Sequence, residues 1–260
     1  MKTALTIAGS DPTGGAGIQM DLKVFRSLGL HGLSVTAALT AQNSTGVSSV
    51  YPVESTIINE QLRVLISDIR PDALKTGMLL TPEAVEAAAD LVELNMLGNL
   101  VIDPVLRSSS GAEMLRNSAL DMMRSRLLPL ADVATPNIKE ASALSGIEIK
   151  NENDIRIAAE KIIASGCKTV IITGGHFDEI SRLSECAPDL FYDGIAFRTI
   201  ETKRINGEFH GTGCAYSAAI TGFIAKGFTV FEAAERAKEF IIKAITESLN
   251  IGKGMKYLNV

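Results

Sequence analysis

The chain has 260 residues, of which 46 % are hydrophobic and 21 % charged, and this composition is too apolar for a disordered protein. Its net charge of −5 argues against nucleic acid or an anionic membrane as the main partner. The three cysteines form no CxxC or Cys/His cluster, and we find no signal peptide or membrane span, so we expect a protein of the reducing cytoplasm.

In the first half of the chain, short β-rich runs alternate with helical patterns. Apolar runs predict strands at Thr3–Ala8, Ser34–Leu39 and Ala73–Lys75. Apolar residues at three- and four-residue spacing predict a helix from Ile18 to Phe25, a second over Ser55–Ile69, and a third that begins at Thr81-Pro82-Glu83. The third start is well marked, because a hydroxyl cap, a proline and an acid follow one another.

The second half repeats this alternation. Strands are predicted at Leu100–Asp103, Val133–Ala134 and Thr169–Thr173, with a hairpin over Leu190–Thr202 that turns at Asp193-Gly194. Helices are predicted around Glu113–Leu127, after Asn137, and over Ile155–Ala164, Gly213–Ala225 and Val230–Leu249. The pattern favours an α/β fold in which helices cover both faces of a mostly parallel sheet. We find no linker and no repeat, so we expect one domain over residues 1–260.

Binding sites in such sheets lie in the loops that follow the strands. The first of these loops is rich in glycine and spans Gly9–Gly17. Its backbone amides could cradle an anion, although a flexible turn explains the composition equally well. The loop is neither a Walker loop nor a GxGxxG fingerprint, so ATP, if bound, is bound in another way.

A second candidate is His210-Gly211-Thr212-Gly213-Cys214, directly before an apolar helix. Free N–H groups at this helix start suit the charge that spreads over a transferring phosphoryl group. Cys214 falls in the first turn, where the helix dipole is expected to lower the pKa of its thiol. The alternative for Cys214 is a small buried apolar residue, and we favour the functional reading.

Further polar residues follow other strands. Asp103, Asn137 and Glu140 could hold Mg²⁺ mainly through waters, although Asn137 and Glu140 also match a capping box. Gly174-Gly175-His176 could wrap a nucleotide phosphate or form a simple turn. Gln42 could read the donor and acceptor pair of a heteroaromatic ring. Asp21 could bind an amine or face water.

These motifs together resemble those of the bacterial hydroxymethylpyrimidine/phosphomethylpyrimidine kinases of thiamine biosynthesis, over residues 3 to about 245. The motifs that carry the resemblance, in chain order, are AGSDPTGGAGIQMDLKVF, TAQNSTGV, KTGML, IDPV, TPNIKEA, TGGH and HGTGC. The resemblance implies a ribokinase-like three-layer α/β/α fold with a central, mostly parallel sheet. It also implies a homodimer that uses ATP and Mg²⁺ to phosphorylate 4-amino-5-hydroxymethyl-2-methylpyrimidine, and then the resulting monophosphate.

The resemblance also implies roles for single residues. The pyrimidine pocket would contain Gly9, Asp21, Gln42 and Met78. The anion hole would be formed by Gly211, Thr212, Gly213 and Cys214, with Cys214 where many ribokinase-like sugar kinases place an aspartate base. The nucleotide phosphates would lie near Asn137, Lys139, Thr173 and Gly175, and Mg²⁺ near Asp103 and Glu140.

This sequence departs from the family pattern at a few positions. Thr173 stands where many relatives have a lysine, Ala215 where a threonine is common, and Thr13 replaces the usual serine. Lys139 or a second metal ion could compensate for the missing lysine. Phe177–Pro188 is unusual and could form a flap. The alternative functions are a pyridoxal or pyridoxine kinase of the same fold and a non-catalytic pyrimidine-binding protein.

Overall fold

The computed structural model of the chain describes residues 1–106, 117–174 and 187–260. Within these ranges, nine strands form one sheet in the order β3-β2-β1-β4-β5-β6-β7-β8-β9. The pairs from β2 through β7 are parallel, whereas β3 pairs antiparallel with β2, and β8 with both β7 and β9. The strands are β1 Thr3–Ser10, β2 His31–Asn43, β3 Gly46–Pro52, β4 Ala73–Thr76, β5 Leu100–Ile102, β6 Val133–Ala134, β7 Val170–Ile172, β8 Asp189–Tyr192 and β9 Phe197–Ile200.

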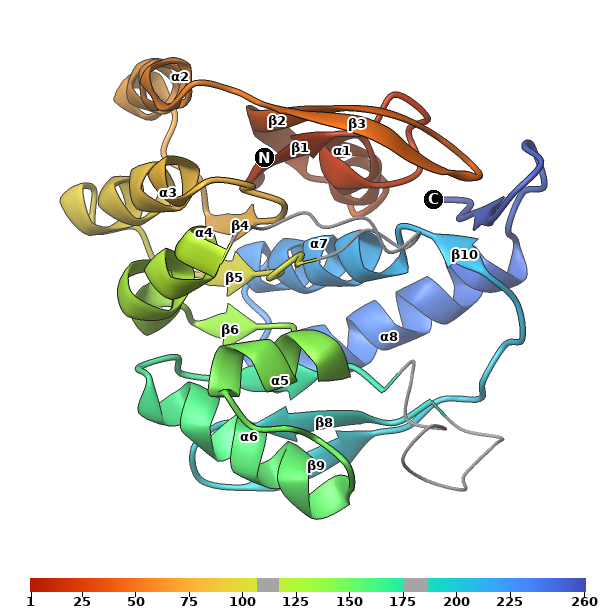
Figure 1. Ribbon diagram of the computed structural model, residues 1–260. Coiled ribbons are helices and arrows are strands. Elements are labelled where there is room, and N and C mark those ends of the chain that lie inside the picture. The colour runs from red at the N-terminus through yellow and green to blue at the C-terminus, as the bar shows by residue number, and fades with distance from the viewer. Residues whose placement is uncertain (107–116, 175–186) are drawn as a thin grey trace.

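Helices cover both faces of this sheet and complete three layers (Figure 1). They are α1 Gly17–Ser27, α2 Ser55–Asp68, α3 Pro82–Leu94, α4 Asn117–Met122, α5 Ile138–Ser145, α6 Glu152–Ala164, α7 Thr212–Ala225 and α8 Val230–Thr246. Helices α2 to α6 pack on one face, and α1, α7 and α8 pack on the other. The expected α/β/α architecture is therefore confirmed.

The central strands are apolar on both sides, which explains why they are visible in the sequence. In β5, Leu100 and Ile102 join the core beneath α2 to α6, whereas Val101 joins the core beneath α1, α7 and α8. Strand β7 repeats this alternation. Because successive side chains point to opposite faces, a strand buried on both faces reads as a continuous apolar run.

Local signals fix several helix ends as predicted. The Thr81 side chain accepts a hydrogen bond from the Ala84 amide at the start of α3. Asn137 and Glu140 form the complete capping box of α5. The region predicted as one helix up to Leu127 contains α4 followed by a π-helical turn, Met123–Leu127, while residues 113–116 lie outside the described residues. Strand β3 was not predicted.

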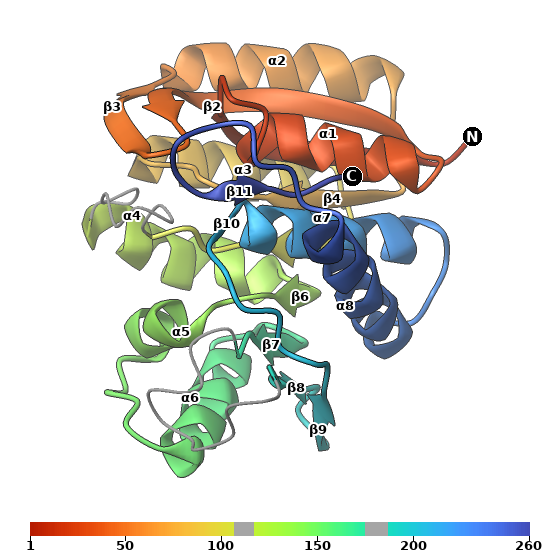
Figure 2. The ribbon, with the colours of Figure 1, turned by 90° about the vertical axis from the view of Figure 1, so that its right-hand side faces the viewer.

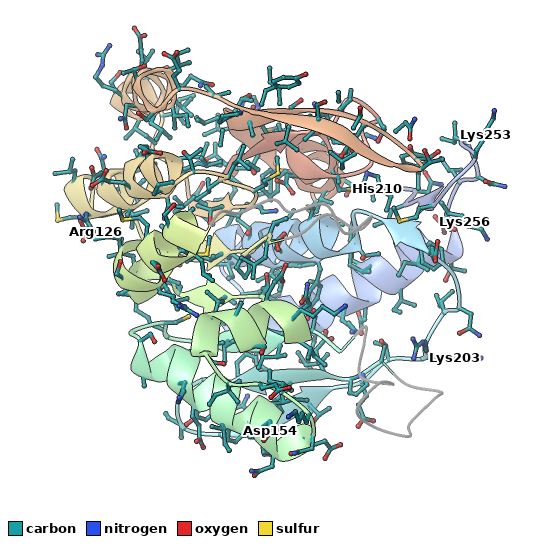
Figure 3. The ribbon with its side chains drawn as sticks, viewed as in Figure 1. Arg126, Asp154, Lys203, His210, Lys253 and Lys256 are labelled. Atoms are coloured by element: carbon teal, nitrogen blue, oxygen red, sulfur yellow. The ribbon has the colours of Figure 1, made fainter. Side chains whose placement is uncertain are left out.

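The carboxyl ends of the parallel strands lie together at one edge of the sheet. Two short strands, β10 Phe209–His210 and β11 Lys256–Tyr257, pair in parallel near the start of α7 (Figure 2). β10 directly precedes α7, whereas β11 follows α8. The C-terminal segment reaches the β2–β3 turn, where the Met255 amide donates to the Ser44 carbonyl at 3.0 Å. Figure 3 shows His210, Lys253 and Lys256 at this same end of the molecule. None of the helices within the described residues is long and apolar enough to cross a membrane.

Candidate active site

A cavity of about 1510 Å³ runs along the carboxyl ends of the parallel strands. Ligand pockets usually measure about 300–1,000 Å³, so this cavity has room for two small ligands. We call its two parts the β1 end and the β8 end. The β1 end is lined by Gly9, Asp11, Gln42, Met78 and His210, and the β8 end by Thr173, Asp189, Thr202, Tyr216 and Lys238.

The structure brings most of the predicted residues together around this cavity. Those that line it are Gly9, Gln42, Met78, Asp103, Asn137, Lys139, Glu140, Thr173, Gly211, Thr212, Gly213 and Cys214. Gly175 and the greater part of the predicted flap lie outside the described residues. The expectation that residues following different strands converge is therefore confirmed for the described part of the chain.

Asp21 is the exception, because its side chain is fully buried and does not line the cavity. Its carboxylate accepts hydrogen bonds from the Lys75 ammonium at 2.9 Å and from the Thr6 hydroxyl at 2.6 Å. This burial rules out the surface position that was one alternative from the sequence, and the amine that Asp21 contacts in this structure is the Lys75 ammonium. Asp21 instead fixes a lysine that the sequence analysis did not assign to any role.

Lys75 is the centre of a buried charge network in the wall of the cavity, which Lys75 and Asp103 both line. Its ammonium lies 2.9 Å from Asp21, 3.8 Å from Asp103 and 3.5 Å from the Cys214 carbonyl. Burial alone would lower the pKa of Lys75, but the two carboxylates raise it above its usual value, so the ammonium stays charged. Burial also raises the pKa of both carboxyl groups, against the effect of Lys75. The network ties β4, β5, α1 and the start of α7 together.

The start of α7 has the open geometry that an anion site requires. Gly211 precedes the helix with a φ of +78°, and a Cβ at this position would collide with the Gly15 carbonyl. Only glycine fits both conditions. No side chain caps this helix end, so its first N–H groups remain available to a ligand.

Cys214 lies in the first turn of α7, but the structure contradicts the expected lowering of its pKa. Burial and the Asp103 carboxylate raise the pKa of the thiol to about 12. The thiol is also a hydrogen-bond partner of Asp103, which in turn accepts a hydrogen bond from Ser217 at 3.0 Å. The lowering of the thiol pKa expected from the helix dipole is outweighed by burial and by the Asp103 carboxylate, both of which raise this pKa. Cys214 is therefore a neutral thiol in this structure.

Asp103 and Glu140 form a pair of buried carboxyl groups on the cavity wall. Glu140 accepts hydrogen bonds from the amides of Asn137 at 2.9 Å and Leu106 at 3.4 Å. Burial and the repulsion of Asp103 nevertheless raise the pKa of Glu140 to about 8. A divalent cation prefers oxygen ligands of this kind and would relieve their repulsion, so the donor set fits Mg²⁺. Among the described residues, no cluster of three or more His, Cys, Asp or Glu side chains could hold a metal by itself.

The β1 end of the cavity is organised by Asp11. Its carboxylate accepts a hydrogen bond from Thr13 at 2.9 Å, lies 2.8 Å from His210 Nε2, and also bonds to the Gln42 side chain. Burial alone would raise the pKa of Asp11, but these hydrogen bonds outweigh burial and lower the pKa to about 2. An ionised carboxylate only accepts hydrogen bonds, so Gln42 must turn its NH₂ group toward Asp11. The Gln42 oxygen then remains for a ligand.

Comparison with known proteins identifies the chain. The family model "Phosphomethylpyrimidine kinase" matches residues 11–259. The chain belongs to the phosphomethylpyrimidine kinase family. A hydroxymethylpyrimidine/phosphomethylpyrimidine kinase of Haemophilus influenzae is 44% identical over 257 residues, which cover 98% of this chain and 94% of the relative.

Solved structures support the ribokinase-like fold of the phosphomethylpyrimidine kinase family. An ADP complex of Bacillus subtilis pyridoxal kinase has a TM-score of 0.90 and 40% identity, covering 100% of this chain and 97% of that one. A phosphomethylpyrimidine kinase of Clostridium difficile has a TM-score of 0.82 and 38% identity, covering 94% of this chain and 100% of that one.

The raised pKa of Glu140 has a consequence for the stability of this phosphomethylpyrimidine kinase family member. The fold favours the protonated carboxyl, so its stabilising effect is complete below the unfolded pKa of 4.5 and is lost as the pH rises through about 8. Glutamine mimics the protonated group. We expect Glu140→Gln to raise the free energy of unfolding by about 2–3 kcal/mol at pH 8 and to have little effect near pH 4.5.

Urea unfolding at the two pH values measures this difference. Glu160→Gln, an exposed change on α6, is the control and should alter stability little at either pH. An equal effect of Glu140→Gln at both pH values would contradict the raised pKa.

Proposed function

We propose that the chain transfers the γ-phosphate of ATP to the hydroxyl of 4-amino-5-hydroxymethyl-2-methylpyrimidine and then phosphorylates the monophosphate to the diphosphate. Membership of the phosphomethylpyrimidine kinase family supports this function, as do the relatives that carry both activities in their names. The observation that carries the proposal is one cavity that joins a ring-reading amide, Gln42, to the open start of α7. That arrangement would allow an acceptor ring and a phosphoryl group to bind within one cavity.

The pyrimidine is proposed to bind at the β1 end. With its NH₂ group turned to Asp11, Gln42 presents its oxygen to the exocyclic amine of the ring. Met78 packs against Gly9, so that a Cβ at position 9 would require the terminal methyl of the Met78 side chain to move. Gly9 and Met78 together would form the apolar surface beneath the ring. Asp21 would not touch the ring but would hold the Lys75 ammonium in position.

ATP is proposed to lie toward the β8 end, with its phosphates near Asn137, Lys139 and Thr173 and over the start of α7. A related pyridoxal kinase has been solved with ADP, which supports nucleotide binding by this fold. Asp103 and Glu140 would hold Mg²⁺ mainly through waters, and Mg²⁺ would neutralise charge on the phosphates. Glu140→Gln should therefore give a more stable protein that has lower activity and needs a higher Mg²⁺ concentration to reach half of that activity.

Cys214 is proposed to remove the proton from the hydroxyl of the first substrate. A thiol with a pKa of about 12 rarely loses its proton unaided. It can act as a base only if it gives its own proton to a neighbour while it receives one from the substrate. Asp103, its hydrogen-bond partner, is the available acceptor. Substrate oxygen, sulfur and carboxylate thus form one path for the proton.

A pyridoxal kinase activity is the second candidate function, because pyridoxal kinases are among the most similar structures. The experiment compares kcat/KM for the hydroxymethylpyrimidine, its monophosphate and pyridoxal with ATP and Mg²⁺. We expect both pyrimidines to be preferred to pyridoxal by at least about tenfold, since pyridoxal lacks the exocyclic amine that is proposed to donate to the Gln42 oxygen. Turnover of pyridoxal alone would show that the chain is a pyridoxal kinase. Tight binding of the pyrimidine without turnover would indicate a binding protein.

We further propose a cytoplasmic homodimer with a single domain over residues 1–260. The use of ATP and of an unpaired thiol suits the reducing cytoplasm. Light scattering on the purified protein tests the assembly. A mass of twice the 27.6 kDa chain is expected, and a mass equal to one chain would contradict the dimer.

A further inference from the structure

We propose that Lys238 of α8 binds the phosphates of ATP at the β8 end of the cavity. The inference rests on the proposed function, since it takes ATP as the phosphate donor. It differs from the expectation that Lys139 or a second metal ion compensates for the lysine that Thr173 replaces. Three observations lead to Lys238: its position, its free donors and its burial.

The position of Lys238 is fixed by Asp189. The Lys238 ammonium lies 2.8 Å from Asp189 Oδ1, and the Gly174 amide donates to the same oxygen at 2.9 Å. Leu190 pairs with Ile172, so Asp189 lies beside Thr173 at the end of β7. The ammonium is therefore held next to Thr173, although α8 is remote from it in sequence. Figure 1 shows α8 alongside α7, whose first turn forms the anion site.

The ammonium has donors to spare. A lysine carries three N–H donors, and Asp189 is its one ion-pair partner within 4.0 Å among the described residues. The Tyr216 ring, 5.9 Å away, offers a weak attraction through its face. Lys238 lines the cavity, so its remaining donors can reach a ligand there. Phosphate oxygens are the acceptors that such donors bind most strongly.

Burial distinguishes Lys238 from the other cations of the cavity. Its side chain is only 12% exposed, whereas Lys139 and Lys203 are exposed to solvent. Lys75 is committed to its two carboxylates, and Arg204 already has an interaction partner. A partly desolvated ammonium that is already held in place attracts an anion more strongly and loses less entropy than a mobile surface lysine.

The test is a calorimetric titration of the whole chain with a nonhydrolysable ATP analogue and, separately, with adenosine, both with Mg²⁺ present. Lys238→Met should weaken binding of the analogue about 10- to 100-fold and binding of adenosine less than about threefold. Lys243→Met, an exposed change on the same helix, is the control and should leave both affinities unchanged. An equal loss for adenosine and the analogue would overturn the proposal.

Two double variants separate this role from mere pairing with Asp189. In Lys238→Met, the buried Asp189 carboxylate loses its counter-charge. Adding Asp189→Asn removes that carboxylate, so the stability of the fold should recover while binding of the analogue stays weak. Recovery of binding would show that Lys238 serves only to neutralise Asp189. Lys238→Met with Thr173→Lys returns an ammonium to the same place and should restore binding. If the unmodified chain does not bind the analogue at all, the proposed function is wrong. If the unmodified chain binds the analogue and Lys238→Met binds it equally well, only this inference is wrong.

Discussion

Cys214→Ala should slow phosphorylation of the hydroxymethyl group roughly 10²–10⁴-fold and slow phosphorylation of the monophosphate far less. The first acceptor is an alcohol, which must lose a proton as it attacks. The second acceptor is a phosphate oxygen, which is already anionic near neutral pH and needs no base. A thiol that removes a proton is therefore required in one step and dispensable in the other.

Single-turnover rates for the two steps, measured with the same preparation, give the comparison. Cys167→Ser is the matched control, because Cys167 is buried elsewhere and its hydrogen bond to the Thr169 carbonyl is also available to serine. Equal losses in both steps after Cys214→Ala would leave the cysteine as a structural part of the anion site. The Asp103→Asn variant should slow both steps, because Asp103 is also a proposed Mg²⁺ ligand. It should slow the first step more, because only that step also loses the proton acceptor.

Lys75→Met should lower the free energy of unfolding by about 3–5 kcal/mol, because it leaves Asp21 and Asp103 buried without a counter-charge. Burial and the loss of Lys75 both raise the pKa of these carboxyl groups, so they take up protons more readily in the folded variant. The loss of stability should therefore be smaller at pH 5 than at pH 8.

Urea unfolding at the two pH values tests this account of the network. Lys2→Met removes the exposed partner of Asp72 and should cost less than about 1 kcal/mol. Adding Asp21→Asn to Lys75→Met should recover part of the stability at pH 8. A loss below about 1 kcal/mol at both pH values would show that the buried network contributes little.

Much of the fold could be predicted because its strands are buried on both faces. β1, β4, β5, β6 and β7 all appear as apolar runs at the expected places. β3 was missed because an edge strand with half-exposed residues and two serines carries only a weak apolar pattern. The clustering of polar residues after the strands was predictable for the same topological reason, since parallel strands end at one edge.

The electrostatics of the site could not be predicted from local patterns. The first turn of α7 indicated a lowered thiol pKa, but burial and Asp103, which directly follows β5, raise it instead. Asp21 and Lys75 are 54 residues apart, and neither position alone reveals that they form a pair. Lys238 and Asp189 lie likewise on separate elements. Such contacts follow from packing, although the KTGML motif did mark the segment that contains Lys75.

The most direct test of the two-step kinase function is a time course with ATP, Mg²⁺ and the unphosphorylated hydroxymethylpyrimidine, with products separated by chromatography. We expect the monophosphate to appear first and the diphosphate to follow, with two molecules of ADP formed for each diphosphate. Accumulation of the monophosphate alone, with no turnover when it is supplied as the substrate, would contradict the two-step function.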